Sequence, residues 1–280
     1  MKDKILVFQS DFGLNEGTVS QMYGVASKVD PSLKMYDITH NIPQFDIWEA
    51  SYSLYQTCHA WPKETVFVSV VDPGVGSSRK SVVAKTSAGH YIVTPNNKSL
   101  THLHKYVGIV ELREIDESVN RIKGSEKSHI FHGRDVYAYT GARLASGVID
   151  FEGVGPLLSL EAIESYPLIE PRIIGSEITG ALDIIDIHFG MLWSNIPIEY
   201  FEKLNIHFGD YINVTIYNKR KQMYKKRVLY GKSFASVKKG EDLLYNNEIG
   251  NLAIATNLEN FAKKYNLSAG IGWTISLITI

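Results

Sequence analysis

Cysteine is almost absent from the sequence. Cys58 is the only one among 280 residues, so an intrachain disulfide cannot form. Such scarcity suits a reducing compartment. The first residues, Met1–Lys4 followed by the short apolar stretch Ile5–Phe8, lack the long apolar core and the small-residue cleavage site of a signal peptide. We therefore expect a cytoplasmic protein.

A long apolar run and a strong charge bias are also missing. No uncharged apolar run approaches the ~20 residues that span a bilayer, so we expect no membrane partner. Lysine and arginine number 29 and the acidic residues 30, for a formal net charge of −1. Proteins that bind nucleic acid are usually more basic, so we do not expect that partner either. The run Lys219–Arg227 holds six basic residues, but it is more typical of a solvated hairpin.

Apolar residues, in contrast, are plentiful. They make up 44% of the chain, which is enough for a large core. The length fits one large domain or two ordinary ones. Strand and helix patterns alternate in the first half, which indicates an α/β domain with a mainly parallel sheet over residues 1–165. The expected strands are Ile5–Gln9, Lys34–Asp37, Thr65–Val71, Ser81–Thr86, His90–Thr94 and Ile109–Leu112, and the expected helices are residues 19–29, Ile47–Ala60, Leu100–Tyr106 and Arg134–Ala145.

The pattern changes after residue 150. Pro156, Pro167 and Pro171 lie in a stretch of weak periodicity, which predicts a linker at about 150–171. Residues 172–280 are rich in short strand signals separated by turn residues, which predicts a smaller antiparallel β domain, a barrel or a sandwich. The expected strands there are Glu177–Ile187, Tyr211–Tyr217, Lys226–Tyr230, Leu252–Thr256 and Trp273–Ile280, with one helix near Ile198–Leu204.

Polar residues follow two strands of the first domain. Asp11 comes after the first strand, and Asp72 comes after the strongest one, Thr65–Val71. Ligands of α/β sheets bind at the carboxyl ends of strands, and a carboxylate there can accept two hydrogen bonds from a ribose diol. Gly74 and Gly76 allow a tight turn, across which Asp72 and Arg79 could form a bidentate pair. Taken singly, each feature is equally well explained by a capping aspartate or a structural ion pair.

A histidine opens the last helix of the first domain. His132 precedes Gly133-Arg134-Asp135, and histidine is a common general base near neutral pH. The positive end of a helix favours its neutral form. For any one of nine histidines, a packing or capping role is the more common one. Arg134 and Asp135 are candidates for a structural pair.

Acids and aromatics gather in the second domain. Asp183, Asp186, His188 and Phe189 stand at the end of its long strand, and Trp193 follows. Such a group could bind an amine and a flat base. The two aromatic side chains are equally compatible with a place in the core.

Five motifs occur in order along nearly the whole chain. They are Gln9–Gly13, Val71–Gly76 with Arg79, Pro95–Asn97, Phe131–Asp135, and Asp186–Gly190 with Ser194–Ile196. Together they resemble the S-adenosylmethionine hydroxide adenosyltransferases, relatives of the fluorinating and chlorinating enzymes. The resemblance implies hydrolysis of S-adenosyl-L-methionine to adenosine and L-methionine, without a cofactor or a metal. It also implies a homotrimer whose active sites lie between the first domain of one subunit and the second domain of its neighbour.

The resemblance also assigns roles to residues. Asp72, Arg79 and His132 match the set that handles water, and the halogenating branch has a tyrosine where Asp72 stands. The residues that match substrate-binding positions are Asp11 for the ribose hydroxyls, Phe45 flanking the substrate, Val75 near the reacting carbon, Asp186 for the methionine ammonium, Phe189 and Phe234 around the adenine, and Asn247 and Glu248 in the methionine pocket. Two positions depart from the family pattern. Met191 stands where an asparagine binds adenine, and Glu248 stands where a serine is usual.

Three other functions stay open at this point. A halogenase of the same fold would depend on chloride or fluoride. A metal-dependent hydrolase could use Asp11, His40, Asp72 and His132, although no compact metal-ligand spacing is present. A non-catalytic protein that binds S-adenosylmethionine or adenosine would show tight binding without turnover.

Overall fold

The chain folds into two compact units, the first ending at Tyr166 and the second beginning at Pro167. The computed structural model describes residues 4–279. Residues 1–3, on which the signal-peptide argument partly depends, and Ile280, the expected end of the last strand, lie outside that range. Among the described residues, no helix is both long and apolar enough to cross a membrane.

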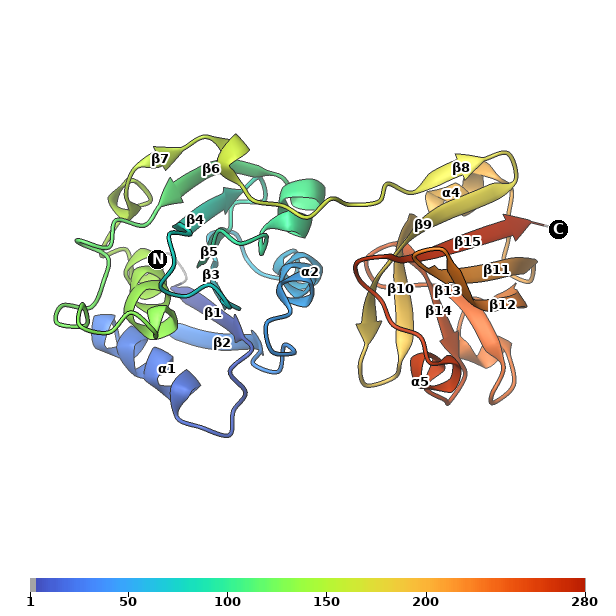
Figure 1. Ribbon diagram of the computed structural model, residues 1–280, viewed down its shortest axis with the longest axis horizontal. Helices are drawn as coiled ribbons and strands as arrows, with labels where there is room; N and C mark the ends of the chain where they lie inside the picture. The colour runs from blue at the N-terminus through green and yellow to red at the C-terminus, as the bar shows by residue number, and fades with distance from the viewer. Residues whose placement is uncertain (1–3, 280) are drawn as a thin grey trace. The chain divides into compact units, whose positions relative to one another are not determined.

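A seven-stranded sheet forms the centre of the first unit (Figure 1). Four adjacent strands, β2-β1-β3-β5, run parallel, and β4, β6 and β7 continue the sheet in antiparallel pairing. The strands are β1 (Ile5–Ser10), β2 (Lys34–Thr39), β3 (Val66–Val70), β4 (Ser81–Thr86), β5 (Tyr91–Pro95), β6 (Ile109–Glu114) and β7 (Leu157–Leu158). The predicted α/β class is confirmed, with the parallel strands confined to one half of the sheet.

Helices cover both faces of this sheet. Side chains alternate along a strand, so Leu6 and Phe8 of β1 pack in the core with α1 (Thr18–Val29) and α3 (Tyr139–Ser146). Ile5 and Val7 of the same strand pack in a second core, to which α2 (Ile47–Cys58) contributes Leu54 and Cys58. Burial on both faces explains why β1 and β3 carry the uninterrupted apolar runs Ile5–Phe8 and Val66–Val68 and do not alternate with polar residues.

Two of the predicted helices contain π-helical turns. Residues Leu103–Val107 are π-helical, and the predicted helix Arg134–Ala145 begins with a π-helical segment at Gly133–Ala138 before continuing as α3. The two helices were therefore predicted correctly, but their π-helical turns were not. A short π-helical turn and an α-helical turn both place apolar residues on one face, so the apolar pattern does not separate them. Such widened turns are frequent at functional sites, and the second one directly follows His132.

Part of the expected linker is structured within the first unit. The 3-10 turns Glu152–Val154 and Leu160–Ala162 flank β7, which pairs with β6 at the edge of the sheet. The backbone of this segment also binds the first unit, since Asn96 Nδ2 donates to Ala162 O at 2.7 Å. Proline content alone therefore does not mark a free connection here.

The second unit is a closed seven-stranded barrel, in which β9 pairs with both β15 and β10 (Figure 1). Its pairings are antiparallel except for a short parallel one between β12 and β13. Its elements are β8 (Arg172–Ile174), β9 (Glu177–Asp186), β10 (Met191–Pro197), α4 (Glu199–Lys203), β11 (Tyr211–Asn218), β12 (Lys221–Tyr230), 3-10 turn Phe234–Ser236, β13 (Asp242–Asn246), β14 (Asn251–Thr256), α5 (Phe261–Tyr265) and β15 (Trp273–Thr279). The predicted β domain is confirmed, and of the two architectures left open, barrel and sandwich, it is the barrel. The elements β8, β10, β13 and α5 were not predicted.

The basic run Lys219–Arg227 lies on the hairpin of β11 and β12, as predicted from the charge balance. Lys219 adopts a positive φ of 56° at the turn. Lys226 donates to Asp242 Oδ2 at 3.2 Å, and most of the run is exposed. This pattern is that of a solvated hairpin.

Gly141 of α3 allows the helix to approach the sheet closely. A Cβ atom at this position would lie 2.5 Å from Val68 Cγ2 of β3. We predict that Gly141→Ala lowers the free energy of unfolding by about 1–3 kcal/mol, as over-packed cores do. The matched control is Gly24→Ala on the exposed side of α1, where nothing lies within 4 Å and alanine should stabilise the helix slightly. Equal stabilities of the two variants in urea unfolding would contradict this packing.

Candidate active site

A cavity of about 410 Å³ opens at the carboxyl edge of the parallel strands in the first unit. β1 and β3 are neighbours, with Ser10 paired to Val70, so the segments that follow them lie at the same edge. Five residues singled out from the sequence line this cavity: Asp11, Phe45, Asp72, Val75 and His132. The other lining residues are Phe12, Glu16, Thr18, Gln44, Val70, Ile130, Phe131 and Gly133.

Asp72 forms a bidentate ion pair with Arg79. Arg79 Nε donates to Asp72 Oδ1 at 2.7 Å, and Nη2 donates to Oδ2. The two side chains are only 5% and 10% exposed, so the pair is largely shielded from water. Arg79 Nη1 also donates to Ser81 Oγ at 3.1 Å, which lies 3.1 Å from Tyr137 Oη. The carboxylate of Asp72 is thereby held in one orientation at the cavity wall.

The loop that carries Asp72 is fixed at both ends. Asn97 Nδ2 donates to Val71 O at 2.9 Å, directly before the aspartate. Gly76 has a φ of +79°, and a Cβ there would lie 3.2 Å from His129 O. A side chain at this position would be strained and would press on the segment that leads to His132.

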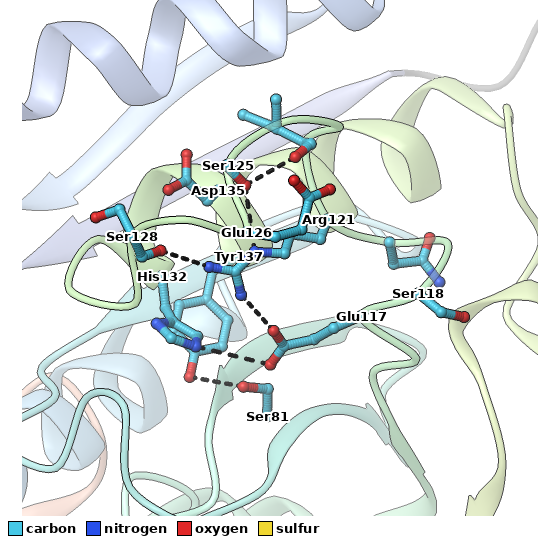
Figure 2. A network of polar contacts seen from close by, with 12 residues as sticks. Ser81, Glu117, Ser118, Arg121, Ser125, Glu126, Ser128, His132, Asp135 and Tyr137 are labelled. Carbon is cyan, nitrogen blue, oxygen red and sulfur yellow. Dashed lines mark hydrogen bonds and ion pairs between the residues drawn. The ribbon is translucent and has the colours of Figure 1, made fainter.

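His132 is a buried histidine whose pKa is lowered, first of all by burial. The positive charges of Arg79 and Arg121 also lower this pKa, while the negative charges of Glu117 and Asp72 raise it. Its Nε2 lies 3.7 Å from Glu117 Oε1, and Figure 2 draws this contact as a dashed line. Its buried Nδ1 has no hydrogen-bond partner within residues 4–279. At neutral pH the ring is therefore neutral and able to accept a proton.

Asp11, which also lines the cavity, binds the backbone of Phe45. Phe45 N donates to Asp11 Oδ2 at 2.9 Å. Phe45 has a φ of 67°, which is unusual for an aromatic residue, and its side chain is 64% exposed. Strained backbone of this kind persists only where surrounding contacts hold it, and it clusters at functional sites.

His40 supports the turn that carries Asp11. Its Nδ1 is 2.7 Å from Ser10 Oγ, its Nε2 is 3.1 Å from Asp37 Oδ1, and its carbonyl accepts from Gly13 N. Both ring nitrogens thus face protein groups. Across residues 4–279, no group of three or more His, Cys, Asp and Glu side chains is arranged to hold a metal ion, so the metal-hydrolase set is not assembled among them.

A second cavity, of about 500 Å³, lies in the barrel unit. Phe189, Met191 and Phe234 line it, together with His188 and residues 256–260. Phe189 is 66% exposed, and its backbone and that of His188 donate to Asp186 Oδ1 at 3.2 and 3.1 Å. The carboxylate of Asp186 therefore stabilises the turn that presents this aromatic ring.

The other members of the predicted cluster have different places. Trp193 is buried in the barrel, so one of the two aromatics belongs to the interior. Asp183 is also buried, which raises its pKa to about 7. Tyr245 Oη donates to the sulfur of Met191 at 2.9 Å, next to the second cavity.

Asn247 and Glu248 follow β13 and do not line that cavity. Asn247 Oδ1 accepts from the backbone of Ile249 and Asn251, which closes the turn before β14. Burial raises the pKa of Tyr245, and the negative charges of Asp186 and Glu248 raise it further. The two carboxylates thus act on the same phenol, although they come from different turns.

The sequence did not single out four residues near these groups. Ser81 and Tyr137 continue the hydrogen bonds from Arg79, and Glu117, paired with Arg121, faces His132 (Figure 2). Glu117 and Arg121 stand four residues apart in an irregular segment between β6 and the π-helical turn. Opposite charges four residues apart were the only sequence feature that could have indicated this ion pair, and such a spacing is common. Arg134, in contrast, pairs with Asp135 as expected.

Comparisons with known proteins agree with this layout. The model for the SAM hydroxide adenosyltransferase N-terminal domain matches residues 6–155, and that for the C-terminal domain matches residues 180–274. A protein named (R)-S-adenosyl-L-methionine hydrolase from Methanocaldococcus jannaschii is 32% identical over 277 residues, covering 95% of each chain. A protein named fluorinase from Nocardia brasiliensis is 27% identical, also with 95% coverage of each chain. The crystal structure of an uncharacterized conserved protein from Thermotoga maritima superposes with a TM-score of 0.88 at 33% identity, covering 98% of this chain and 99% of that one. The family resemblance is confirmed: the chain belongs to the SAM hydroxide adenosyltransferase family.

Proposed function

We propose that this protein hydrolyses S-adenosyl-L-methionine to adenosine and L-methionine, with Asp72, Arg79 and His132 as its catalytic residues. The observation that carries the proposal is that Asp72, held by Arg79 in a bidentate ion pair, and a neutral His132 line the same cavity. The relative from M. jannaschii, which bears the name of this activity and matches along almost the whole chain, supports the same substrate.

The reaction is an in-line displacement at the 5′ carbon of the ribose. A water oxygen forms the new bond to this carbon while the carbon–sulfur bond breaks. The electron pair of that bond stays on sulfur, so the positively charged sulfonium becomes the neutral thioether of methionine. A leaving group of this kind needs no proton, and the whole difficulty lies in the nucleophile.

Two groups act on the water. Asp72 is an acceptor held by Arg79, so it orients one O–H of the water, while the neutral ring of His132 accepts the proton that is released. The partial shielding of the ion pair keeps competing solvent away from the reacting atoms. No step in this scheme requires a metal or a cofactor.

The remaining residues hold the substrate. In this proposal Asp11 accepts hydrogen bonds from the ribose hydroxyls, and Phe45 and Val75 contact the reacting part of the substrate. Phe189 and Phe234 pack against the adenine, with Met191 beside them, because all three line the second cavity. Asp186 receives the methionine ammonium, and the turn with Asn247 and Glu248 lies at the amino-acid end.

The fluorinase relatives make halide the natural rival to water. An anion that approached the reacting carbon would meet the negative charge of Asp72, whereas a water molecule can donate to it. The carboxylate thus favours water. A non-catalytic protein would differ from a hydrolase and from a halogenase because it would bind the substrate without turnover.

We further propose a homotrimer in which the first unit of one chain and the barrel of a neighbouring chain together hold one substrate. Each unit by itself carries only part of the predicted binding set. Large apolar side chains are exposed around both cavities, with Ile130 at 81% beside the first and Leu258 at 78% beside the second. Exposed apolar side chains of this size around cavities are typical of surfaces that bind a partner.

The hydrolysis is tested by two substitutions at the nucleophile. We expect Asp72→Asn and His132→Gln each to lower turnover by roughly 100-fold or more, the size typical of a lost general base. Chromatography for adenosine and methionine, with and without halide and a chelator, measures the effect. The controls Glu161→Gln and His59→Gln remove a carboxylate and an imidazole from exposed positions, and they should leave the rate unchanged.

Thermal melting of all four variants identifies those that are folded. Full activity in a folded Asp72→Asn or His132→Gln protein would contradict the assignment. A rate that depends on added halide, or that disappears with the chelator, would favour one of the rival enzymes.

The shared site is tested by mixing two inactive proteins. Asp72→Asn alters only the first unit, and Asp186→Asn alters only the barrel. If each site uses the first unit of one chain and the barrel of another, unfolding and refolding a 1:1 mixture should restore activity to about a quarter of the sites. Each site then receives a wild-type first unit with a chance of about one half and a wild-type barrel with the same chance. Light scattering should give the mass of a trimer. Absence of any recovery in a trimeric mixture would show that the site is not shared.

A further inference from the structure

Glu117 is the polar side chain that faces Nε2 of His132. The distance from its Oε1 to that nitrogen is 3.7 Å, which is within ion-pair range but long for a direct hydrogen bond. The histidine is 7% exposed, and the glutamate side chain is 37% exposed. The carboxylate thus bridges solvent and the buried ring.

Arg121 holds Glu117 in this place. Its Nη1 donates to Glu117 Oε2 at 2.5 Å, while its Nε donates to Ser125 Oγ at 3.2 Å and its Nη2 donates to Ser128 O at 2.8 Å (Figure 2). The arginine side chain is only 6% exposed. Because three acceptors fix Arg121, the arginine cannot follow a movement of Glu117. Arg121 therefore limits the positions that the carboxylate can take.

The other nitrogen of the ring stands in a different environment. Nδ1 of His132 is buried and has no hydrogen-bond partner in the described part of the chain. A neutral imidazole carries one proton, and the nitrogen that faces a carboxylate is the one that keeps it. The ring needs its other nitrogen unprotonated to accept a proton.

We propose that Glu117, held by Arg121, is a positioning residue that keeps the proton of neutral His132 on Nε2 and leaves the lone pair on Nδ1. Glu117 does not itself contact the cavity, since it is absent from the cavity wall. The catalytic consequence rests on the proposed hydrolysis, whereas the tautomer and the titration of His132 do not.

The charged groups around the ring set the sign of the expected change. Glu117 and Asp72 favour the imidazolium, while Arg79 and Arg121 oppose it, and the phenol ring of Tyr137 packs 6.5 Å from the imidazole, centre to centre. Removing the charge of Glu117 takes away attraction and leaves both arginines. The pKa of His132 must then fall.

The test is a nitrogen NMR titration of the full-length protein labelled at histidine, with the His132 signals assigned from their loss in His132→Asn. In the wild type we expect Nε2–H as the neutral tautomer. In Glu117→Gln the titration midpoint of His132 should move to lower pH by about 0.5 or more. The control Glu126→Gln removes a carboxylate from the same loop that is not among the groups acting on His132, and it should leave the midpoint in place.

Steady-state kinetics supply the second measurement. In Glu117→Gln the acidic limb of kcat/KM should move to lower pH together with the NMR midpoint, and kcat should fall by about tenfold while KM changes less. Glu117→Asp should recover part of the loss.

Two results would overturn the proposal. One is an Nδ1–H tautomer in the wild type, and the other is an unchanged midpoint in a folded Glu117→Gln protein. Neither depends on which reaction the protein catalyses, so a failure of the proposed hydrolysis would be recognised separately, as absence of turnover in the wild type.

Discussion

The ion pair between Asp72 and Arg79 is the interaction on which the rest of the first cavity depends. Both groups are nearly withdrawn from water, so each is stable there only because the other is present. Loss of one partner from such a pair typically costs about 3–5 kcal/mol. The loop after β3 is therefore fixed by electrostatics as well as by its turn, and the carboxylate points in one direction.

This constraint extends to the histidine. Arg79 reaches Asp72 and Ser81, and Ser81 reaches Tyr137 on the π-helical turn that begins after His132. The same arginine helps to keep the imidazole neutral. One guanidinium thus orients the acceptor for water and favours the form of the base that can take its proton. Glu117 opposes this effect by favouring the imidazolium, while Arg121, which holds Glu117, acts in the same direction as Arg79.

Much of this arrangement could be predicted from the sequence, and the reason is local. Continuous apolar strands followed by Asp11 and by Asp72 specify parallel strands that end at one edge, and the structure places both carboxylates there. The barrel was also predicted from its short strands and turns. These features can be read from the sequence because each is specified by residues that are neighbours in the chain.

The parts that were missed depend on distant contacts. Periodicity does not separate a π-helical turn from an α-helical one, so the widening after His132 was not visible. Trp193 and Phe189 have the same apolar character, yet only the fold decides that the first is buried and the second exposed. Glu117 and Arg121 stood in an irregular polar segment, where spacing carries little information.

The central claim is that water attacks the 5′ carbon of the ribose in a site built around Asp72, Arg79 and His132. The most direct measurement is mass spectrometry of the products formed from S-adenosyl-L-methionine in water enriched in oxygen-18. We expect the label in the 5′ hydroxyl of adenosine and unlabelled methionine. Adenosine without the label, or label in methionine, would contradict this claim.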